Sequence, residues 1–279
     1  MFHTLDKFLI GFVRYRLQDT YIDPPGRTGH APGSEESVRI EIVPSGRLGA
    51  RGAELVARTL RDAVAARGRA TVAFSGGSTP RPLLVALAGG DVPWSRVDVL
   101  QVDERVAPQG HEARNLTALR SCLLDHVPLP PDRLHAMPVD AADLEAAAAD
   151  YARTLRDLAG RPPILDLVHL GLGEDGHTAS LVPDLLWFAD EGSEQGDEGG
   201  DRGVATTPCF HGYRRMTLTP SVLSRARRLL WFVSGAAKAR VVRELVERNP
   251  AIPAGRIDTA RAVLLLDEPA ARDLGRPPG

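Results

Sequence analysis

The sequence predicts an α/β protein in which a single domain has a mostly parallel sheet flanked by helices. Two observations carry this prediction. Short apolar runs alternate along the chain with longer segments in which apolar residues recur at helical spacing. Polar or glycine-rich turns follow several of the apolar runs, as expected where a buried strand leads into a helix. Such connections place successive strands parallel within one sheet.

The first half of the domain is predicted to contain a strand, a helix and a βαβ unit. Residues 38–42 alternate apolar and polar side chains, which is typical of a strand. Residues 49–67 carry leucine and valine at helical spacing. A buried strand at 70–74, a helix at 81–87 and a strand at 97–102 then follow around a glycine-rich turn.

The second half continues the alternation of helices and strands. Two helices are expected at about 116–124 and 141–158, the second rich in alanine, and a strand is expected at 165–170. The remaining elements are predicted as two strands, a helix and a final buried strand, at 216–218, 229–233, 236–248 and 262–266. The chain contains no internal repeat.

Two segments stand outside this pattern. Residues 1–37 have no periodicity after a short apolar and basic stretch, and we expect a flexible N-terminal extension ahead of a domain at 38–279. Residues 190–203 are rich in acidic residues and glycine and lack apolar side chains, so they are predicted to form a surface loop.

Composition excludes several classes of protein. A formal net charge of −2 gives no broad attraction for nucleic acid. Cys122 and Cys209 lack the spacing of a zinc site or a disulfide framework, which favours a reducing cytoplasm. The apolar run at 8–13 is too short to cross a bilayer, so no membrane anchor is expected. Lys7 and Lys238 are the only lysines, which draws attention to Lys238 as a compact cation in an arginine-rich chain.

The first motif with chemical content is the turn from Ser75 to Pro80. Gly76 and Gly77 let the main chain approach a ligand, while Ser78 and Thr79 add hydroxyl donors at a helix N-terminus. A phosphate would fit such a turn. The motif is neither a P-loop nor a nucleophile elbow, and an ordinary helix-capping turn would have a similar sequence.

The second motif, Gln101 to Arg105, follows the next strand and should face the first turn across the sheet edge. Arg105 is expected to bind phosphate oxygens in a bidentate manner. Asp103 or Glu104 could orient a substrate hydroxyl or hold an arginine in place. A solvated ion pair at a strand end is the alternative. Downstream, Asn115 is a further candidate for substrate binding, together with His111 and Arg114.

The third motif runs from Leu170 to Ser180 and follows another apolar strand. Its glycines match the G-x-G-x-x-G pattern of dinucleotide sites, but no acidic residue ends a further strand at the required distance, and Pro183 interrupts the helix that should follow. His177 beside Asp175 suggests a general base that takes a proton from water. Asp175 could orient His177 or form an Asp-Gly turn, and His177 could be a surface histidine.

The fourth group combines residues 214–219 with residues 235–238. Arg215 precedes a short apolar strand, and Lys238 lies at the start of a helix after another strand. Lys238 is expected to bind the phosphate of a substrate, because a cation at a helix N-terminus beside a strand end can neutralise an anion. Arg215 is a further candidate for phosphate binding. A solvated lysine is the alternative for Lys238.

Taken in order, these four motifs resemble the 6-phosphogluconolactonases, with a match over about 38–274 whose most specific part is residues 171–181. The related glucosamine-6-phosphate deaminases usually have Asn-Gly-His followed by Phe-Asn-Glu-Pro, which this chain lacks. The resemblance implies a modified Rossmann-like fold, no metal, no cofactor and a histidine general base at His177. It also implies a phosphate site drawn from Gly76, Gly77, Ser78, Thr79, Arg105 and Lys238.

The resemblance therefore leads us to expect a cytoplasmic enzyme that hydrolyses 6-phosphogluconolactone with water activated by His177. The partner would be the phosphorylated sugar lactone, and the enzyme would be a monomer or a small homo-oligomer. Val182, Asp184 and Arg114 depart from the family pattern, which has Phe, Gly and Ser. A sugar phosphate isomerase or deaminase and a non-catalytic sugar phosphate sensing domain are the alternatives.

Overall fold

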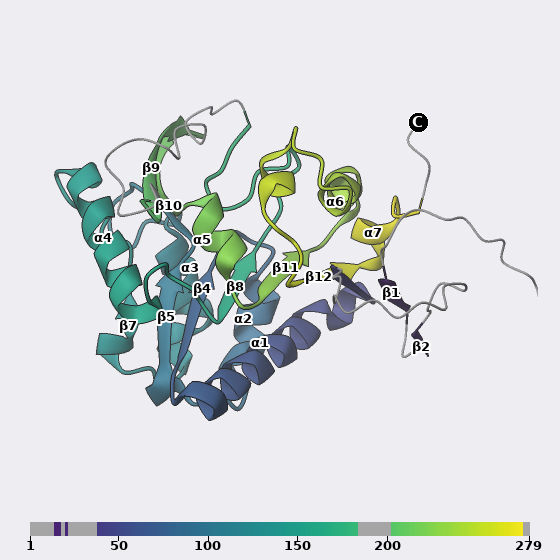
Figure 1. Ribbon diagram of the computed structural model, residues 1–279, viewed down its shortest axis with the longest axis horizontal. Helices are drawn as coiled ribbons and strands as arrows, with labels where there is room; N and C mark the ends of the chain where they lie inside the picture. Colours follow the sequence, from purple (N-terminus) through teal and green to yellow (C-terminus); the bar gives the residue numbers. More distant parts are fainter. Residues whose placement is uncertain (1–13, 18–19, 22–37, 184–201, 276–279) are drawn as a thin grey trace, which may run out of the picture.

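A nine-stranded sheet forms the centre of the fold in the computed structural model, which describes residues 14–17, 20–21, 38–183 and 202–275 (Figure 1). The strand order is β2-β1-β3-β12-β11-β8-β4-β5-β7. All neighbouring strands are parallel except β1 and β2. The strands are β1 (Arg14–Leu17), β2 (Thr20–Tyr21), β3 (Arg39–Val43), β4 (Ala70–Phe74), β5 (Val97–Gln101), β7 (Leu134–His135), β8 (Leu167–Leu170), β11 (Leu229–Val233) and β12 (Ala262–Asp267).

Helices cover both faces of this sheet, which confirms the predicted single α/β domain with a mostly parallel sheet. One face is covered by α1 (Ser45–Arg67), α2 (Arg81–Ala88) and α3 (Asn115–Cys122). The other is covered by α4 (Leu144–Ala159), α5 (Pro220–Arg225), α6 (Ala239–Val246) and α7 (Glu268–Ala271). Short 3-10 turns complete the fold at Trp94–Arg96, Leu124–His126, Pro131–Arg133, Ala236–Lys238 and Pro253–Arg256.

The central strands are apolar on both sides because both sides are buried. Phe74 and Phe232 point into the core under α1, α2 and α3, whereas their chain neighbours Ala73 and Trp231 point into the core under the other helices. Successive side chains of a strand face opposite sides of the sheet, so a strand between two helical layers needs apolar residues at every position. This is why β4, β11 and β12 appear in the sequence as mainly apolar runs, whereas Asp98 in β5 and His169 in β8 are buried polar exceptions.

A second sheet of three antiparallel strands, in the order β6-β10-β9, lies beyond the end of β5 (Figure 1). It consists of β6 (Asp103–Arg105), β9 (Val204–Phe210) and β10 (Tyr213–Leu218). Residues 216–218 are a strand as expected, but they belong to this separate sheet and not to the parallel one. No local pattern indicates β6 or β9, and the pairing of β6 with β10 brings residues about a hundred positions apart into register.

The two segments predicted to lie outside the regular pattern are only partly described. Inside the expected N-terminal extension, β1 pairs in parallel with β3, so residues 14–17 and 20–21 are not without regular structure. The remainder of residues 1–37 and nearly all of the acidic loop at 190–203 lie outside the described residues. The flexibility of the extension and the surface position of the loop therefore stay predictions.

A buried histidine in β8 should make the fold sensitive to acid. His169 is fully buried between the rings of Phe74 and Phe232, and neither ring nitrogen has a hydrogen-bond partner among the described residues. Burial lowers the pKa of His169 from 6.5 to about 4. As the pH falls, the histidine of the unfolded chain is therefore protonated at a higher pH than His169 of the folded protein. The free energy of unfolding consequently decreases between about pH 6.5 and pH 4.

We expect His169→Leu to remove this acid-sensitive component. The wild-type free energy of unfolding should fall by roughly 3 kcal/mol more than that of the variant between pH 7 and pH 4, since one pKa unit corresponds to about 1.4 kcal/mol. Urea unfolding of both proteins at a series of pH values measures this difference. Parallel pH dependences in the two proteins would contradict it.

Candidate active site

The predicted site residues follow the carboxyl ends of four parallel strands. Gly76 to Thr79 follow β4, Asp103 and Arg105 follow β5, Asp175 and His177 follow β8, and Lys238 follows β11. The carboxyl ends of parallel strands share one edge of the sheet, and this edge is the usual ligand position in open α/β folds. The fold therefore brings the four motifs to the same side of the molecule.

His177 and Asp175 form a hydrogen-bonded pair in the loop after β8. His177 Nδ1 lies 2.6 Å from Asp175 Oδ1, and the same oxygen accepts a hydrogen bond from the backbone N–H of His177 at 3.1 Å. About a third of the His177 side chain is exposed to solvent. With Nδ1 donating to the carboxylate, Nε2 carries the lone pair of the ring and is free to accept a proton.

Asp175 is stabilised in its charged form by this arrangement. Burial raises the pKa of Asp175, but hydrogen bonds from His177 and the positive charge of its ring lower it by more, so the net pKa lies below the ordinary value. A carboxylate at this position favours the imidazole tautomer with its proton on Nδ1 and stabilises an imidazolium when Nε2 takes up a proton.

Two glycines of the G-x-G-x-x-G pattern are explained by the packing of this loop. A Cβ on Gly173 would lie 2.1 Å from His177 Nδ1, so a side chain there would collide with the ring. Gly176 has a φ of 82°, and a Cβ on it would lie 2.6 Å from Ile252. The glycines thus serve the placement of His177 and give no support for a dinucleotide site.

Arg105 and Arg215 lie opposite each other on β6 and β10. Arg215 is almost fully buried, and the Nε atoms of both arginines are buried without a hydrogen-bond partner among the described residues. Burial lowers the pKa of Arg215, and the neighbouring charge of Arg105 lowers it further. Two like charges with unused donors form a favourable place for an anion such as phosphate.

Asn115 and Asp103 connect the glycine-rich turn to the histidine loop. Asn115 Nδ2 donates to Asp103 Oδ1 at 3.1 Å, and Ser180 Oγ donates to Asp103 Oδ2 at 2.7 Å. A Cβ on Gly76 would lie 1.9 Å from Asn115 Oδ1, so the turn passes directly against the amide. Gly77, which has a φ of 102°, continues the turn towards Ser78 and Thr79. Asp103 and Asn115 are therefore buried and engaged with protein groups.

Glu104 binds the backbone at Arg105 and at the start of α3, and its carboxylate lies beside Arg114. It is fully buried, and its carboxylate accepts backbone hydrogen bonds from Arg105 at 2.8 Å and from Asn115 at 2.7 Å. Gln101 Nε2 donates to it at 2.8 Å, and Arg114 Nε lies 3.4 Å away. Of the two roles open to Asp103 and Glu104 in the sequence, holding an arginine in place is the one Glu104 fulfils. It also neutralises the N-terminus of α3.

Lys238 lies close to the histidine loop. Its Nζ is 3.8 Å from Glu174 Oε1, and Arg240 Nη2 donates to the backbone carbonyl of Glu174 at 3.0 Å. The lysine side chain is about one-fifth exposed, whereas Glu174 is mostly exposed. An incoming phosphate could replace the weak contact with Glu174, because exposed ion pairs of this kind contribute little.

Phe210 is the site residue that sequence reasoning missed. Its ring lies 5.8 Å from the His177 ring, and Arg215 Cζ lies 5.0 Å from its centroid. Ser180 was also missed as the partner of Asp103. Nothing marks Phe210 in the sequence, since β9 contains Pro208 and lacks regular alternation. Gly212 is a nearby residue typical of turns, and the structure places both it and His211 at positive φ in a tight hairpin turn.

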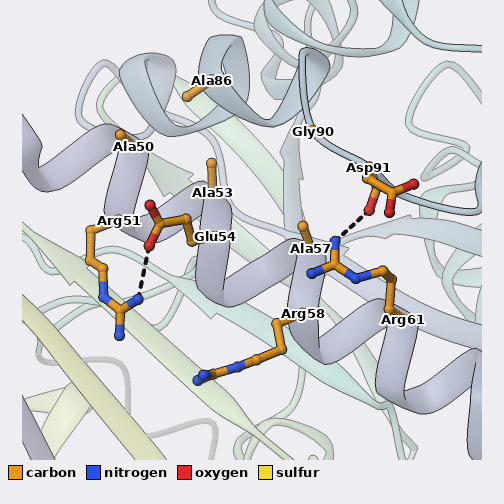
Figure 2. A pocket seen from close by; sticks show the side chains of 10 residues that line it. All are labelled: Ala50, Arg51, Ala53, Glu54, Ala57, Arg58, Arg61, Ala86, Gly90 and Asp91. Carbon is orange, nitrogen blue, oxygen red and sulfur yellow. Dashed lines mark hydrogen bonds and ion pairs between the residues drawn. The ribbon is translucent and has the colours of Figure 1, made fainter.

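Within the described part of the chain, no three His, Cys, Asp or Glu side chains gather as metal ligands would. No helix there is long and apolar enough to cross a bilayer. A hollow of about 450 Å³ lies against α1, away from the strand ends, and contains none of the predicted site residues (Figure 2). In the wall of this hollow, Arg51 pairs with Glu54, and Arg61 donates to the backbone carbonyl of Asp91. The hollow therefore offers no chemistry comparable to that of the histidine site.

Known proteins resemble this chain in sequence and in fold. The chain is 37% identical over 227 residues to a 6-phosphogluconolactonase of Synechocystis, a match that covers 78% of this chain and 90% of the relative. A solved 6-phosphogluconolactonase structure from Thermotoga maritima superposes with a TM-score of 0.70 at 23% identity, covering 82% of this chain and 98% of that one.

The same fold also supports another reaction. A monomeric glucosamine-6-phosphate deaminase superposes with a TM-score of 0.66 at 19% identity, covering 84% of this chain and 98% of that one. The fold alone therefore does not distinguish the two activities. The family model for glucosamine-6-phosphate isomerases/6-phosphogluconolactonase matches residues 45–266. This chain belongs to the glucosamine-6-phosphate isomerase/6-phosphogluconolactonase family.

Proposed function

We propose that this protein hydrolyses 6-phospho-D-glucono-1,5-lactone to 6-phosphogluconate in the oxidative pentose phosphate pathway. The observation that supports this most is the hydrogen bond between His177 and Asp175 at the edge of the sheet. The Phe210 ring lies between His177 and the buried Arg215, which faces the partly buried Arg105 on the neighbouring strand. The name and the 37% identity of the Synechocystis relative favour the lactone over other phosphorylated sugars.

In the proposed reaction His177 acts on water. Nε2 takes a proton from a water molecule while the water oxygen forms a bond to the C1 carbonyl carbon of the lactone. The tetrahedral intermediate then collapses, the bond between C1 and the ring oxygen breaks, and His177 returns the proton to that oxygen. Asp175 holds the ring through Nδ1 and stabilises its transient positive charge. The products are a hydroxyl group and a carboxylic acid, which ionises at neutral pH.

Substrate binding depends on the phosphate in this proposal. Arg105, Arg215 and Lys238 supply positive charge, and the turn with Gly76, Gly77, Ser78 and Thr79 supplies backbone and hydroxyl donors at the N-terminal end of α2. The most direct support is that the Nε atoms of these two arginines have no hydrogen-bond partner among the described residues, while Arg105 and Arg215 face each other across β6 and β10. Asp103 and Asn115 hold this turn, and a role for them in contacting sugar hydroxyls is part of the proposal.

A pH-stat assay with freshly generated lactone tests the function. Acid release well above the rate of spontaneous hydrolysis is expected from the purified protein. Glucosamine 6-phosphate is the parallel substrate, and release of ammonia from it would instead support a deaminase. Ligand binding without turnover of either compound would support a sugar phosphate sensor.

Arg215→Ala is expected to raise the KM for the phosphorylated lactone by about 10- to 100-fold and to change kcat less, because charge-assisted hydrogen bonds contribute about 1.5–3 kcal/mol. Steady-state kinetics with this substrate and with unphosphorylated gluconolactone measure the effect. Arg214→Ala is the control, since Arg214 is exposed and pairs with Glu145. An equal loss on both lactones would show that Arg215 does not act through phosphate.

The proposal also covers the setting of the enzyme. A cytoplasmic location is supported by Cys122 and Cys209, which are free thiols, one of them exposed. We propose a monomer or a small homo-oligomer that needs no metal and no cofactor. Light scattering of the purified protein, and activity measured after dialysis against a chelator, test these points.

A further inference from the structure

Phe210 ends β9 directly before a two-residue hairpin turn. His211 and Gly212 adopt φ values of 50° and 84°, and both positive angles suit the tight turns that join twisted antiparallel strands. The turn places Phe210 opposite Tyr213 on β10. The position of the Phe210 ring is thus set by the hairpin, whose other strand carries Arg215.

The ring of Phe210 contacts both ends of the proposed site. Its plane meets the His177 ring at 71° with the centroids 5.8 Å apart, an edge-to-face arrangement that aromatic pairs favour. The guanidinium of Arg215 lies over the same ring, 5.0 Å from its centroid. The backbone carbonyl of Phe210 also accepts a hydrogen bond from Arg215 Nη2 at 3.0 Å.

Neither His177 nor Arg215 is otherwise fully restrained. The hydrogen bond to Asp175 fixes His177 Nδ1 but leaves the ring free to turn about that contact, and a third of the side chain faces solvent. Arg215 has a buried Nε without a partner among the described residues. The Phe210 ring is a rigid body in contact with both groups, so it limits the motion of each and sets the distance between them.

We propose that Phe210 is a positioning residue that holds the general base and the phosphate-binding arginine in one fixed geometry. This proposal rests on the proposed lactonase function. Misplacement of a reacting group by about 1 Å can lower a rate by about 10²-fold, so a rigid spacer between the lactone end and the phosphate end has a direct effect on turnover.

Three substitutions separate the two contacts. Phe210→Ala should lower kcat by about 3- to 10-fold through His177 and raise the KM for the phosphorylated lactone by about 3- to 30-fold through Arg215. Phe210→Leu keeps bulk against His177 but loses the aromatic face, so kcat should recover in part while KM stays high. Phe210→Tyr keeps the ring and should restore both constants to within about twofold of the wild-type values.

Tyr213→Ala is the matched control. Tyr213 is the cross-strand neighbour of Phe210, and its ring packs against His111 and not against His177 or Arg215. The control should retain wild-type kcat and KM, even if both alanine variants lower the thermal midpoint equally. The proposal is overturned if Phe210→Ala leaves both constants unchanged, or if Tyr213→Ala changes them to the same extent. Absence of turnover by the wild-type protein in the same assay would instead refute the lactonase function.

Discussion

Replacing His177 with alanine is expected to lower kcat for lactone hydrolysis by about 10²- to 10⁴-fold with little change in KM. A positioned general base contributes this much, and the proposed phosphate contacts come from other strands. The lactone hydrolyses slowly in water without catalysis, so the rate above this background is the quantity to measure. The pH-stat assay used for the wild-type protein provides it.

Two further variants make this result specific. His126→Ala removes another exposed histidine, in the 3-10 turn Leu124–His126 that follows α3, whose Nε2 lies 2.9 Å from the Ser121 carbonyl. It should retain wild-type activity. Asp175→Asn should lower kcat by less than His177→Ala, because the amide still occupies the place of the carboxylate but no longer stabilises a charged ring. Unchanged turnover in His177→Ala would show that the base has been assigned wrongly.

The parallel sheet could be predicted from the sequence because its strands are buried on both faces. β4, β11 and β12 are mainly apolar runs bounded by turn residues, β5 has apolar residues around Asp98, and the helices between the strands repeat apolar residues at helical spacing. β6 gave no such signal, because it is the polar tripeptide from Asp103 to Arg105. Its conformation depends on pairing with β10, a contact that no local pattern reports.

In the site, too, features with a local sequence pattern could be predicted, and features that depend on long-range strand pairing could not. Residues 75–80, 101–105, 170–180 and 235–238 could be found because each segment follows a parallel strand, and parallel strands place their carboxyl ends together, whereas residues 214–219 largely form β10 itself. The pairing of Arg105 with Arg215 could not be found, since it depends on the register of two antiparallel strands far apart in the sequence. Phe210 was missed for the same reason. The contact between Asp175 and His177 is local and was anticipated as one of two possible roles for the carboxylate.

Glu104→Ala is expected to cause the largest loss of stability, about 3–5 kcal/mol in the free energy of unfolding. The substitution removes the buried carboxylate beside Arg114, whose other acidic partner, Asp140, is more than half exposed, and removal of one partner of a buried ion pair costs this much. It also leaves the backbone N–H groups of Asn115 and Leu116 at the start of α3 without their acceptor. Urea unfolding at neutral pH measures the loss.

Glu145→Ala is the matched control for this prediction. Glu145 pairs with Arg214 at 3.2 Å, a distance close to that of the buried pair, but both side chains are more than half exposed. Exposed pairs contribute at most about 1 kcal/mol, so this variant should unfold almost as the wild-type protein does. Equal losses in the two variants would mean that burial does not decide the contribution of Glu104. A loss confined to Glu104→Ala would instead identify the carboxylate beneath Arg105 and Asn115 as the group that stabilises this edge of the sheet.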